Sequence, residues 1–492
     1  MNHLTNSRRA GVLAHITSLP SQEDLGKMDS NARKFIDWLQ ETGFSVWQIL
    51  ALGPTHYDRS PYLSLSAFAG NPNLISVKAL CEDQALNETW LGPVLRRARY
   101  DSFEGIRTGL LSDRADLKIS LLPGAAEFLK DNAFWLKDYA EYQTLRFSQG
   151  HTSWWTWPDA LRDRDSTAVK KVVKQHADMH HGLLVEQYLF DRQWRSLKDY
   201  ANERGISLFG DIPLYVAHDS VDVWANKRYF ALDDDGQPAE VAGVPPDMFS
   251  EDGQVWGNPV FNWSQIKNDN FDWWIARIRR QLSLVDLLRI DHFRGLQAYW
   301  SIPAGDETAK QGKWIKTPGK ELLDAAKTAL GNLPLVAEDL GYITEEVDAL
   351  RTSFEIPSMR VLQFGFDGSQ DNPHLKANVE ESTVYYTGTH DNDTVVSWFD
   401  DLHEDAQRWI REMLRMSPED AIEDAMVENV LESSAALAIL PVQDILGLGA
   451  GNRMNMPGTT EGNWIWQFDW NQLGSSVTHK FKKLINQSQR SV

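Results

Sequence analysis

Short runs of apolar residues, rich in β-branched or bulky side chains, recur eight times along the chain. Most are followed by polar or helix-like stretches, an alternation that is typical of strand and helix units. Near-continuous hydrophobicity, as in LAILPV at 437–442, indicates parallel strands buried on both faces. The pattern predicts an α/β fold, a (β/α)8 TIM barrel. The predicted strands span residues 11–19, 45–52, 206–216, 287–293, 333–338, 359–366, 383–389 and 436–442.

The spacing of these runs divides the chain into three parts. Residues 1–52 hold the first two predicted barrel strands. About 150 residues then precede the third strand, far more than the short loops of barrel units, so 53–205 is predicted to be an insertion that folds on its own. Its later part, 125–204, has the mixed apolar and charged periodicity of helices. Residues 206–492 supply the remainder of the barrel, with further loop insertions.

Charge and aromatic content narrow the range of partners. The 69 acidic residues outnumber the 49 basic ones, and the net charge of -20 opposes binding to nucleic acid or to an anionic membrane. An uncharged substrate is more compatible with this negative net charge than a polyanion. The chain has 20 Trp residues, and although most are expected in the core, flat apolar rings are the surfaces on which sugars stack.

Cysteine usage and hydropathy favour a cytoplasmic protein. Cys81 is the only cysteine, which excludes an intrachain disulfide or a thiolate metal cluster and favours a reducing compartment. The first apolar stretch is too short and too interrupted for a secretory signal. No run approaches the roughly 20 apolar residues of a membrane span.

Acidic side chains stand where several predicted strands end. Active residues of such barrels come from the C-terminal ends of strands and the loops that follow. Arg289 and Asp291 project to the same side because side chains alternate along a strand, so the cation can keep the carboxylate ionised. One such carboxylate can equally cap a helix or form an ion pair. Several from separate strands predict one shared site: Asp211; Arg289, Asp291 and His292; Glu338 and Asp339; His390, Asp391 and Asp393.

These endings belong to longer segments in which the chain resembles the 4-α-glucanotransferases, also called amylomaltases or disproportionating enzymes, of the α-amylase clan. Agreement by chance over so many ordered segments is improbable. The segments are SPYLSLSAFAGNP from Ser60, GDIPLYVAHDSVDVWAN from Gly210, GVPPDMFSEDGQVWGNP from Gly243, RIDHFRG, VAEDLG, YTGTHDNDT and the Gly-rich LGLGAGNRMNMPGTTEGNWIW.

The resemblance implies a role for each residue of the site. Asp291 is expected to be the nucleophile, Glu338 the general acid and base, and Asp391 the residue that stabilises the transition state. Independent chemistry agrees, because retaining glycosyl transfer needs one carboxyl group to attack the anomeric carbon and another to protonate the leaving oxygen. Arg289 and His390 are expected to contact the sugar at the cleavage site.

The same resemblance implies the binding residues on either side of the cleavage point. Ser60, Tyr62, Asp211 and Asn463 are expected on the donor side. On the acceptor side the segment 243–258 is expected to act as a lid that becomes mobile through its glycines and slows hydrolysis by excluding water. Its expected sugar contacts are Phe249, Gln254 and Trp256.

The match is imperfect around the substrate sites. The usual HPTSLP is HITSLP here, so Ile16 replaces a proline, and the glycines that usually follow are replaced by SQEDLGKMDS. The second loop, GPTHYDRSPYLS, carries His56, Arg59 and Leu63 as substitutions, and Met248 stands where an aromatic residue is common. Preferred glucan length and the ratio of transfer to hydrolysis therefore stay open.

Two other functions remain as alternatives. A hydrolase could use the same carboxylates, with water in place of the acceptor sugar. A noncatalytic glucan-binding protein could keep the fold, although it would be expected to have lost a key carboxylate. The partners expected are malto-oligosaccharides and α-1,4-glucans, while oligomeric state and pathway stay open.

Three further motifs have simpler explanations. GLGAGN from Gly447 departs from the dinucleotide fingerprint at Asn452 and lies in a barrel's last loop. DDDG at 233–236 is read as a turn, because Ala231 and Ala242 occupy positions where a calcium loop needs ligands. The HDND cluster from His390 is explained by catalysis without a metal, so we predict neither metal nor cofactor.

Overall fold

The structure is a computed structural model that describes residues 8–21, 24–97, 106, 118–246 and 250–491. Its centre is a sheet of eight strands in the order β10-β11-β12-β1-β2-β3-β6-β9, and every hydrogen-bonded pair is parallel. The two edge strands meet where the Ala337 N–H donates to the Pro357 carbonyl at 3.0 Å, so the sheet curls into a nearly closed barrel. The predicted (β/α)8 barrel is confirmed. The strands are β1 (Arg9–Leu13), β2 (Val46–Gln48), β3 (Ser207–Ile212), β6 (Leu287–Ile290), β9 (Leu335–Ala337), β10 (Ser358–Val361), β11 (Thr383–Tyr386) and β12 (Leu437–Pro441).

Each of the eight predicted runs overlaps a barrel strand, but every strand ends earlier than its run. After β1, the apolar residues continue into the 3-10 helix η2 (Ile16–Ser18), and after β10 they continue into η9 (Leu362–Gly365). These turns are buried too, which is why hydrophobicity alone cannot mark the strand end. The polar residues at the ends of the runs therefore lie in loops at the barrel mouth.

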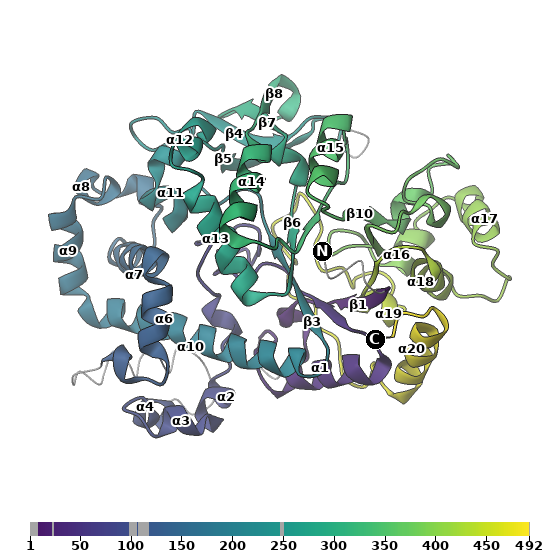
Figure 1. Cartoon of the computed structure of the whole chain (residues 1–492), viewed down its shortest axis with the longest axis horizontal. Helices are drawn as coiled ribbons and strands as arrows, with labels where there is room; N and C mark the ends of the chain where they lie inside the picture. Colours follow the sequence, from purple (N-terminus) through teal and green to yellow (C-terminus); the bar gives the residue numbers. More distant parts are fainter. Residues whose placement is uncertain (1–7, 22–23, 98–105, 107–117, 247–249, 492) are drawn as a thin grey trace.

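Helices surround the barrel and start where local sequence caps them (Figure 1). In α1 (Ser30–Thr42) the Asp29 carboxylate accepts the Asn31 N–H at the start, and Gly43 ends the helix with φ +88°. The apolar face of α1 buries Phe35, Ile36 and Leu39. The other helices around the barrel include α13 (Asp272–Leu284), α14 (Gly319–Leu330), α15 (Glu345–Ser353), α16 (Val395–Asp400), α17 (Glu404–Met413), α18 (Ile422–Glu432) and α20 (Ser475–Gln487).

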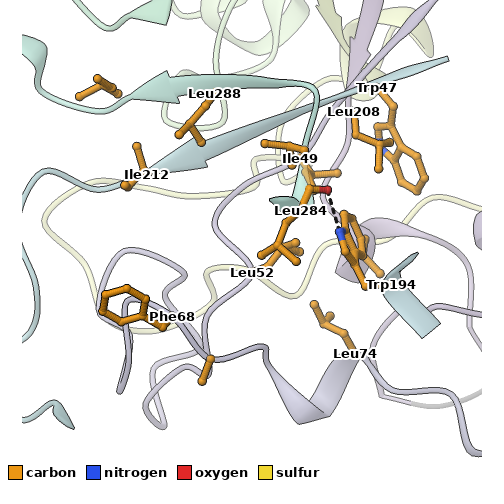
Figure 2. Close-up of a cluster of buried hydrophobic side chains, with 14 of the residues drawn as sticks. Trp47, Ile49, Leu52, Phe68, Leu74, Trp194, Leu208, Ile212, Leu284 and Leu288 are labelled. Atoms are coloured by element: carbon orange, nitrogen blue, oxygen red, sulfur yellow. Dashed lines mark hydrogen bonds between the residues drawn. The ribbon is translucent and has the colours of Figure 1, made fainter. Parts of the chain in front are cut away.

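The long interval between β2 and β3 is rich in helices, which lie on one side of the barrel (Figure 1). The longest, α10, runs back to the barrel just before β3. Trp194 of α10 is fully buried, and its indole N–H donates to the Leu284 carbonyl at 2.8 Å (Figure 2). This contact joins the inserted helices to the barrel core around Trp47 and Leu208. The helices are α2 (Val77–Glu82), α3 (Gln84–Asn87), α4 (Gly92–Arg97), α6 (Ala125–Asp131), α7 (Ala133–Ser148), α8 (Asp159–Arg162), α9 (Ser166–Gln175) and α10 (Ala177–Asn202).

A second sheet of four antiparallel strands, in the order β5-β4-β7-β8, was not predicted. Its strands are β4 (Glu240–Val244), β5 (Gln254–Pro259), β7 (Ala298–Pro303) and β8 (Lys313–Lys316). The segment 243–258, expected as a loop, begins and ends in the β4–β5 hairpin. Gly243 is required by close pairing, since a Cβ there would lie 2.1 Å from the Gln254 carbonyl oxygen. Gly253 and Gly257 have φ of +66° and +75°, which suits turns and irregular strands.

The C-terminal helix α20 packs against α1 and α18 on the outside of the barrel. After α20, the fully buried Arg490 donates to the carbonyls of Leu431, Ser433, Ala435 and Arg9, at 2.6 to 2.9 Å. Arg9 begins β1 and Ala435 precedes β12, so the guanidinium holds the N-terminal ends of two neighbouring strands. Among the described residues, no helix is long and apolar enough to span a bilayer.

Candidate active site

Arg289 is at the centre of the polar network at the barrel mouth. It lies within β6, buried, and its Nε donates to Asp211 Oδ1 of β3 at 2.9 Å. Its Nη2 donates to Asp291 Oδ1 at 2.6 Å. Tyr62 completes the network, because its hydroxyl donates to Asp211 Oδ2 at 2.6 Å. The strand alternation foreseen for residues 289 and 291 is therefore what the structure shows, with Asp211 as a second acceptor.

Asp291 lies in a strongly negative environment. Burial raises the pKa of the Asp291 carboxyl well above its usual range; Arg289 opposes this shift, while Asp211, Glu338 and Asp391 add to it. Its side chain nevertheless remains 31% exposed, which limits desolvation, and the contact with Arg289 is short. We therefore place the negative charge of the Asp291–Glu338 pair on Asp291 and the shared proton on Glu338.

Glu338 follows β9 and is held by backbone donors. Its Oε2 accepts the N–H of His292, the residue after Asp291, at 2.6 Å, and its Oε1 accepts the Leu340 N–H at 3.1 Å. The first bond depends on the left-handed conformation of His292, whose φ is +51°. Burial raises the pKa of Glu338 despite Arg289 and these two donors. A raised pKa favours the protonated form of this carboxyl group, which is the form that can act as an acid.

Asp339 makes structural contacts, unlike its neighbour Glu338. It is buried, and its Oδ1 accepts the Met359 N–H at 2.7 Å while Arg360 contacts Oδ2 at 3.2 Å. These contacts tie the end of β9 to β10 across the barrel seam. Of the two acidic residues that end this predicted strand, only Glu338 faces the polar network.

Asp391 lies in the loop between β11 and α16 and is held from the last long loop of the barrel. Asn455 Nδ2 donates to Asp391 Oδ1 at 2.7 Å, and Arg453 Nη2 donates to the Asp391 carbonyl at 2.7 Å. The side chain is 48% exposed. Sequence reasoning did not single out Arg453 or Asn455; both lie within the Gly-rich segment, so position within that motif was the available signal.

His390 and Tyr62 form an aromatic wall beside these carboxylates. Their rings stack at 5.2 Å with an interplanar angle of 12°, and Trp464 lies 5.9 Å from each ring. Burial lowers the pKa of His390, which makes the neutral imidazole the favoured form. His390 Nε2 lies 3.4 Å from Asp391 Oδ2 and makes no hydrogen bond within the described part of the chain. The hydrogen-bonding capacity of this buried nitrogen is therefore unused among the described residues.

His15 was not foreseen as part of this region. Its Nδ1 accepts the Leu50 N–H at 3.2 Å. Burial lowers its pKa to about 3, with a smaller contribution from His390. The imidazole is thus neutral and carries its proton on Nε2. The sequence offered the signal in the HITSLP segment, where His15 follows the apolar residues of β1.

The other residues expected on the donor side have different surroundings. Tyr62 and Asp211 line a cavity beneath the 60–66 loop, together with Arg277. The Ser60 hydroxyl accepts the Tyr62 N–H at 3.3 Å and so shapes that loop. Asn463 is buried, and its amide spans its own loop, bonding to Met456 N–H and Thr459 at 2.9 to 3.0 Å. A sugar contact by Asn463 stays a prediction.

The β4–β5 hairpin reaches the site through Trp256. Its ring meets the His292 ring edge to face at 4.9 Å, and its N–H donates to Gln254 Oε1 at 3.0 Å. Gln254 and Trp256 are two residues apart on β5 and therefore share a face. Phe249 and Met248 lie outside the described residues.

The altered loops contact one another beside the donor side. Arg59 pairs with Asp24 at 2.9 Å, joining the loop after β2 to the loop after β1. Arg59 adopts a left-handed conformation, with φ +63°. This pair is exposed and contributes at most about 1 kcal/mol, so it shapes the loops more than it stabilises the fold.

Comparison with known proteins agrees with this geometry. The family model of the 4-alpha-glucanotransferases matches residues 14–472. A 4-alpha-glucanotransferase from Synechocystis is 44% identical over 485 residues, covering 96% of this chain and 95% of that protein. The 4-alpha-glucanotransferase of Thermus thermophilus is 40% identical, covering 98% of this chain and 99% of that protein.

A solved structure extends the likeness to three dimensions. The amylomaltase from Streptococcus agalactiae, determined in complex with acarbose, superposes with a TM-score of 0.90. It is 34% identical, and the match covers 99% of this chain and 100% of that chain. With three carboxylates gathered at the mouth of the same barrel, this chain belongs to the 4-alpha-glucanotransferase family, whose members include the amylomaltases.

Proposed function

We propose that this 4-alpha-glucanotransferase moves segments of α-1,4-glucan from a donor to an acceptor glucan through a covalent intermediate on Asp291. The observation that carries the proposal is the hydrogen bond from the His292 N–H to Glu338 at 2.6 Å, which places the two carboxyl groups beside each other. Arg289 holds Asp291 in the same arrangement. Retaining transfer requires two carboxyl groups roughly 5 Å apart.

In the first step, the Asp291 carboxylate attacks the anomeric carbon of the donor. The glycosidic C–O bond breaks, and Glu338 gives its proton to the departing oxygen, which leaves as the free hydroxyl of the shortened glucan. The product is a glycosyl ester of Asp291. Asp391, whose carboxylate Asn455 orients, stabilises the positive charge that develops on the sugar ring.

In the second step, the hydroxyl of an acceptor glucan attacks the same carbon. Glu338, now ionised, takes the hydroxyl proton, the ester bond breaks, and Asp291 regains its charge. Configuration is retained because the carbon is inverted twice. Glu338 therefore alternates between acid and base, for which a raised pKa is suited.

The proposal extends to the binding residues that the family resemblance implies. Arg289 and His390 contact the sugar at the cleavage point, and Ser60, Tyr62, Asp211 and Asn463 bind or shape the donor side. Gln254, Trp256 and Phe249 serve the acceptor side, with the 243–258 segment as a lid. Support comes from the contact of Trp256 with His292 at 4.9 Å and from the acarbose complex of the related amylomaltase. The substrates are malto-oligosaccharides and longer α-1,4-glucans.

The product profile from maltotriose tests the function. A transferase converts maltotriose into glucose together with maltopentaose and longer oligomers. Release of glucose and maltose without elongation would instead identify a hydrolase, in which water intercepts the ester. No turnover with any glucan would support a noncatalytic glucan-binding protein. Equal amounts of the Asp291→Asn protein serve as the blank for contaminating activity.

A further inference from the structure

The loop that carries His390 and Asp391 is held at both ends by one carboxylate that the mechanism does not use. Asp444 Oδ2 accepts the hydroxyl of Thr387, the residue after β11, at 2.6 Å. Asp444 Oδ1 accepts the N–H of Val395, the first residue of α16, at 2.9 Å. The loop between these two points is residues 388–394, so a single side chain sets the distance between its ends.

Asp444 lies in a buried position, where desolvation of a carboxylate costs free energy. It is 3% exposed and follows β12, in the short helix α19 (Val442–Ile445). Burial raises its pKa to about 6, and Asp393 and Glu423 contribute in the same direction. A carboxylate in this position destabilises the fold unless its hydrogen bonds offset the desolvation. Two short hydrogen bonds to one loop are what it gains.

The interior of the loop is constrained by its own residues and by η9, the 3-10 helix that follows β10. Asn392 Oδ1 accepts both the Thr389 N–H and its hydroxyl, at 2.9 and 2.8 Å. Gln363 Nε2 donates to the Asp393 carbonyl at 2.9 Å. With the interior fixed, displacement of the loop ends moves the loop, and Asp391 with it, as a unit.

The restraints on Asp391 itself come from the same stretch of chain as Asp444. Arg453 and Asn455 follow the end of α19 at Ile445 by eight and ten residues, and they hold the Asp391 carbonyl and carboxylate, each at 2.7 Å. The segment after β12 thus fixes the base of the loop through Asp444 and its tip through these two residues.

We infer that Asp444 is a positioning residue, which sets the reach of the Asp391 carboxylate toward the sugar at the cleavage point by fixing both ends of the 387–395 loop. The inference rests on the role proposed above for Asp391. Asp444 itself contacts neither reacting carboxyl group. A displacement of about 1 Å in a catalytic group can lower a rate by about 100-fold, so a restraint of this kind acts on turnover.

Three substitutions test the contacts at the two ends of the loop. Asp444→Ala removes both hydrogen bonds, and it is expected to lower kcat for maltotriose disproportionation by about 10- to 100-fold, with KM changed less than about threefold. Thr387→Val removes only the hydroxyl contact and gives a smaller loss in the same direction. It also provides the measurement should Asp444→Ala not fold. Asp444→Asn restores most of the rate, because its amide can accept from Val395 and donate to the Thr387 oxygen.

A double-mutant cycle with Asp391→Asn distinguishes positioning from general stability. If Asp444 acts through Asp391, adding Thr387→Val or Asp444→Ala to the Asp391→Asn protein lowers the residual rate by less than about threefold. Equal fold losses in both backgrounds would overturn the inference while leaving the proposed function intact. Wild-type turnover by Asp391→Asn alone would overturn the residue roles and this inference together.

Asp191→Asn is the matched control. Asp191 lies on α10, within the helical insertion, and is also a buried carboxylate, 3% exposed. It pairs with Arg280 of α13 at 2.9 Å. Its substitution is expected to lower the midpoint of thermal unfolding without changing kcat. Should Asp191→Asn lower kcat as much as Asp444→Ala does, the effect belongs to stability and the inference fails.

Discussion

Arg289 links two carboxylates through separate nitrogens, and its geometry explains why a lysine is not an equivalent replacement. The Nε atom serves Asp211 and Nη2 serves Asp291, so two directed hydrogen bonds come from one planar group. A lysine ammonium is a point charge that can satisfy one of these acceptors well but not both. The pKa of Asp291 is the quantity most sensitive to this difference, since Arg289 is what opposes the effect of burial.

Arg289→Lys is therefore expected to shift the pH dependence of turnover. Losing the directed contact raises the pKa of Asp291 further, so protonation of the nucleophile begins at a higher pH. The acid limb of kcat/KM moves up by about one pH unit, which corresponds to about 1.4 kcal/mol. Initial rates of maltotriose disproportionation between pH 4 and 9, roughly the range where carboxyl and imidazole groups titrate, measure the shift. An unchanged acid limb would show that Arg289 does not control the charge of Asp291.

Glu338→Gln separates the two chemical steps when the donor is varied. With maltotriose the first step needs a proton, and the rate is expected to fall by about three orders of magnitude. With maltotriosyl fluoride, whose leaving group needs no proton, fluoride is released in an initial burst. The ester on Asp291 then accumulates because no base activates the acceptor, and intact-protein mass spectrometry detects it. Equal losses with both donors would remove Glu338 from the acid role.

The residues of the site were foreseen to the extent that strand ends reveal them. Asp291, Glu338 and Asp391 follow strands, and a strand end is visible as a polar residue after an apolar run. Arg453 and Asn455 were missed because they come from a long loop whose return to the site depends on tertiary structure. The backbone turn at His292, with φ +51°, could not be foreseen either, since most histidines have a negative φ even though histidine is enriched among the exceptions.

At the scale of elements, the barrel was predictable and the antiparallel sheet was not. Buried parallel strands give uniform apolar runs, whereas β4, β5, β7 and β8 are four to six residues long and each includes partly or fully exposed positions. Such short mixed segments resemble loops. For that reason both ends of the segment 243–258, expected as a loop, lie in strands that were not predicted. The glycines expected to give it mobility include Gly243, which close strand pairing requires.

Gly243→Ala is expected to disturb the hairpin that brings Trp256 to the site. The added methyl would lie 2.1 Å from the Gln254 carbonyl oxygen, a backbone atom, so the strands must separate. We expect KM for a glucose acceptor to rise by about tenfold, equivalent to about 1.4 kcal/mol of lost binding, with a smaller change in kcat. Gly182→Ala in α10 is the control, because a Cβ there meets nothing within 4 Å. Equal acceptor KM in both variants would exclude the hairpin from acceptor binding.

At the scale of the whole molecule, the contacts of Arg490 and the carboxylates of the site lie at opposite ends of the barrel strands. Arg490 binds carbonyls at the N-terminal ends of β1 and β12, while the carboxylates lie beyond the C-terminal ends. This separation is general in (β/α)8 barrels, in which the loops at the C-terminal ends of the strands carry the active site. Substitutions at the two ends are therefore expected to affect different measurements.

Arg490→Ala tests that separation. Removing the guanidinium leaves buried carbonyls without their donor, and the free energy of unfolding is expected to fall by about 2 to 4 kcal/mol. Turnover at 25 °C, roughly the reference temperature of these energies, is expected to stay within about twofold of the wild type. Denaturant unfolding gives the free energy of unfolding, and maltotriose kinetics on the same preparations give the turnover. A loss of turnover without a loss of stability would contradict the assignment of Arg490 to the fold alone.

The joint between β9 and β10 has a kinetic consequence. The backbone bond from Ala337 to Pro357 joins these strands, and Asp339 adds a carboxylate bridge to Met359, in place of the regular ladder found between the other neighbours. Local opening of the barrel is therefore expected to begin there, and the amides of Ala337 and Met359 should exchange with deuterium before that of Val12. Glu338 directly follows β9, so a bound glucan could restrain this joint. Slower exchange of these two amides when glucan is bound would show that ligand binding stabilises the contact between β9 and β10.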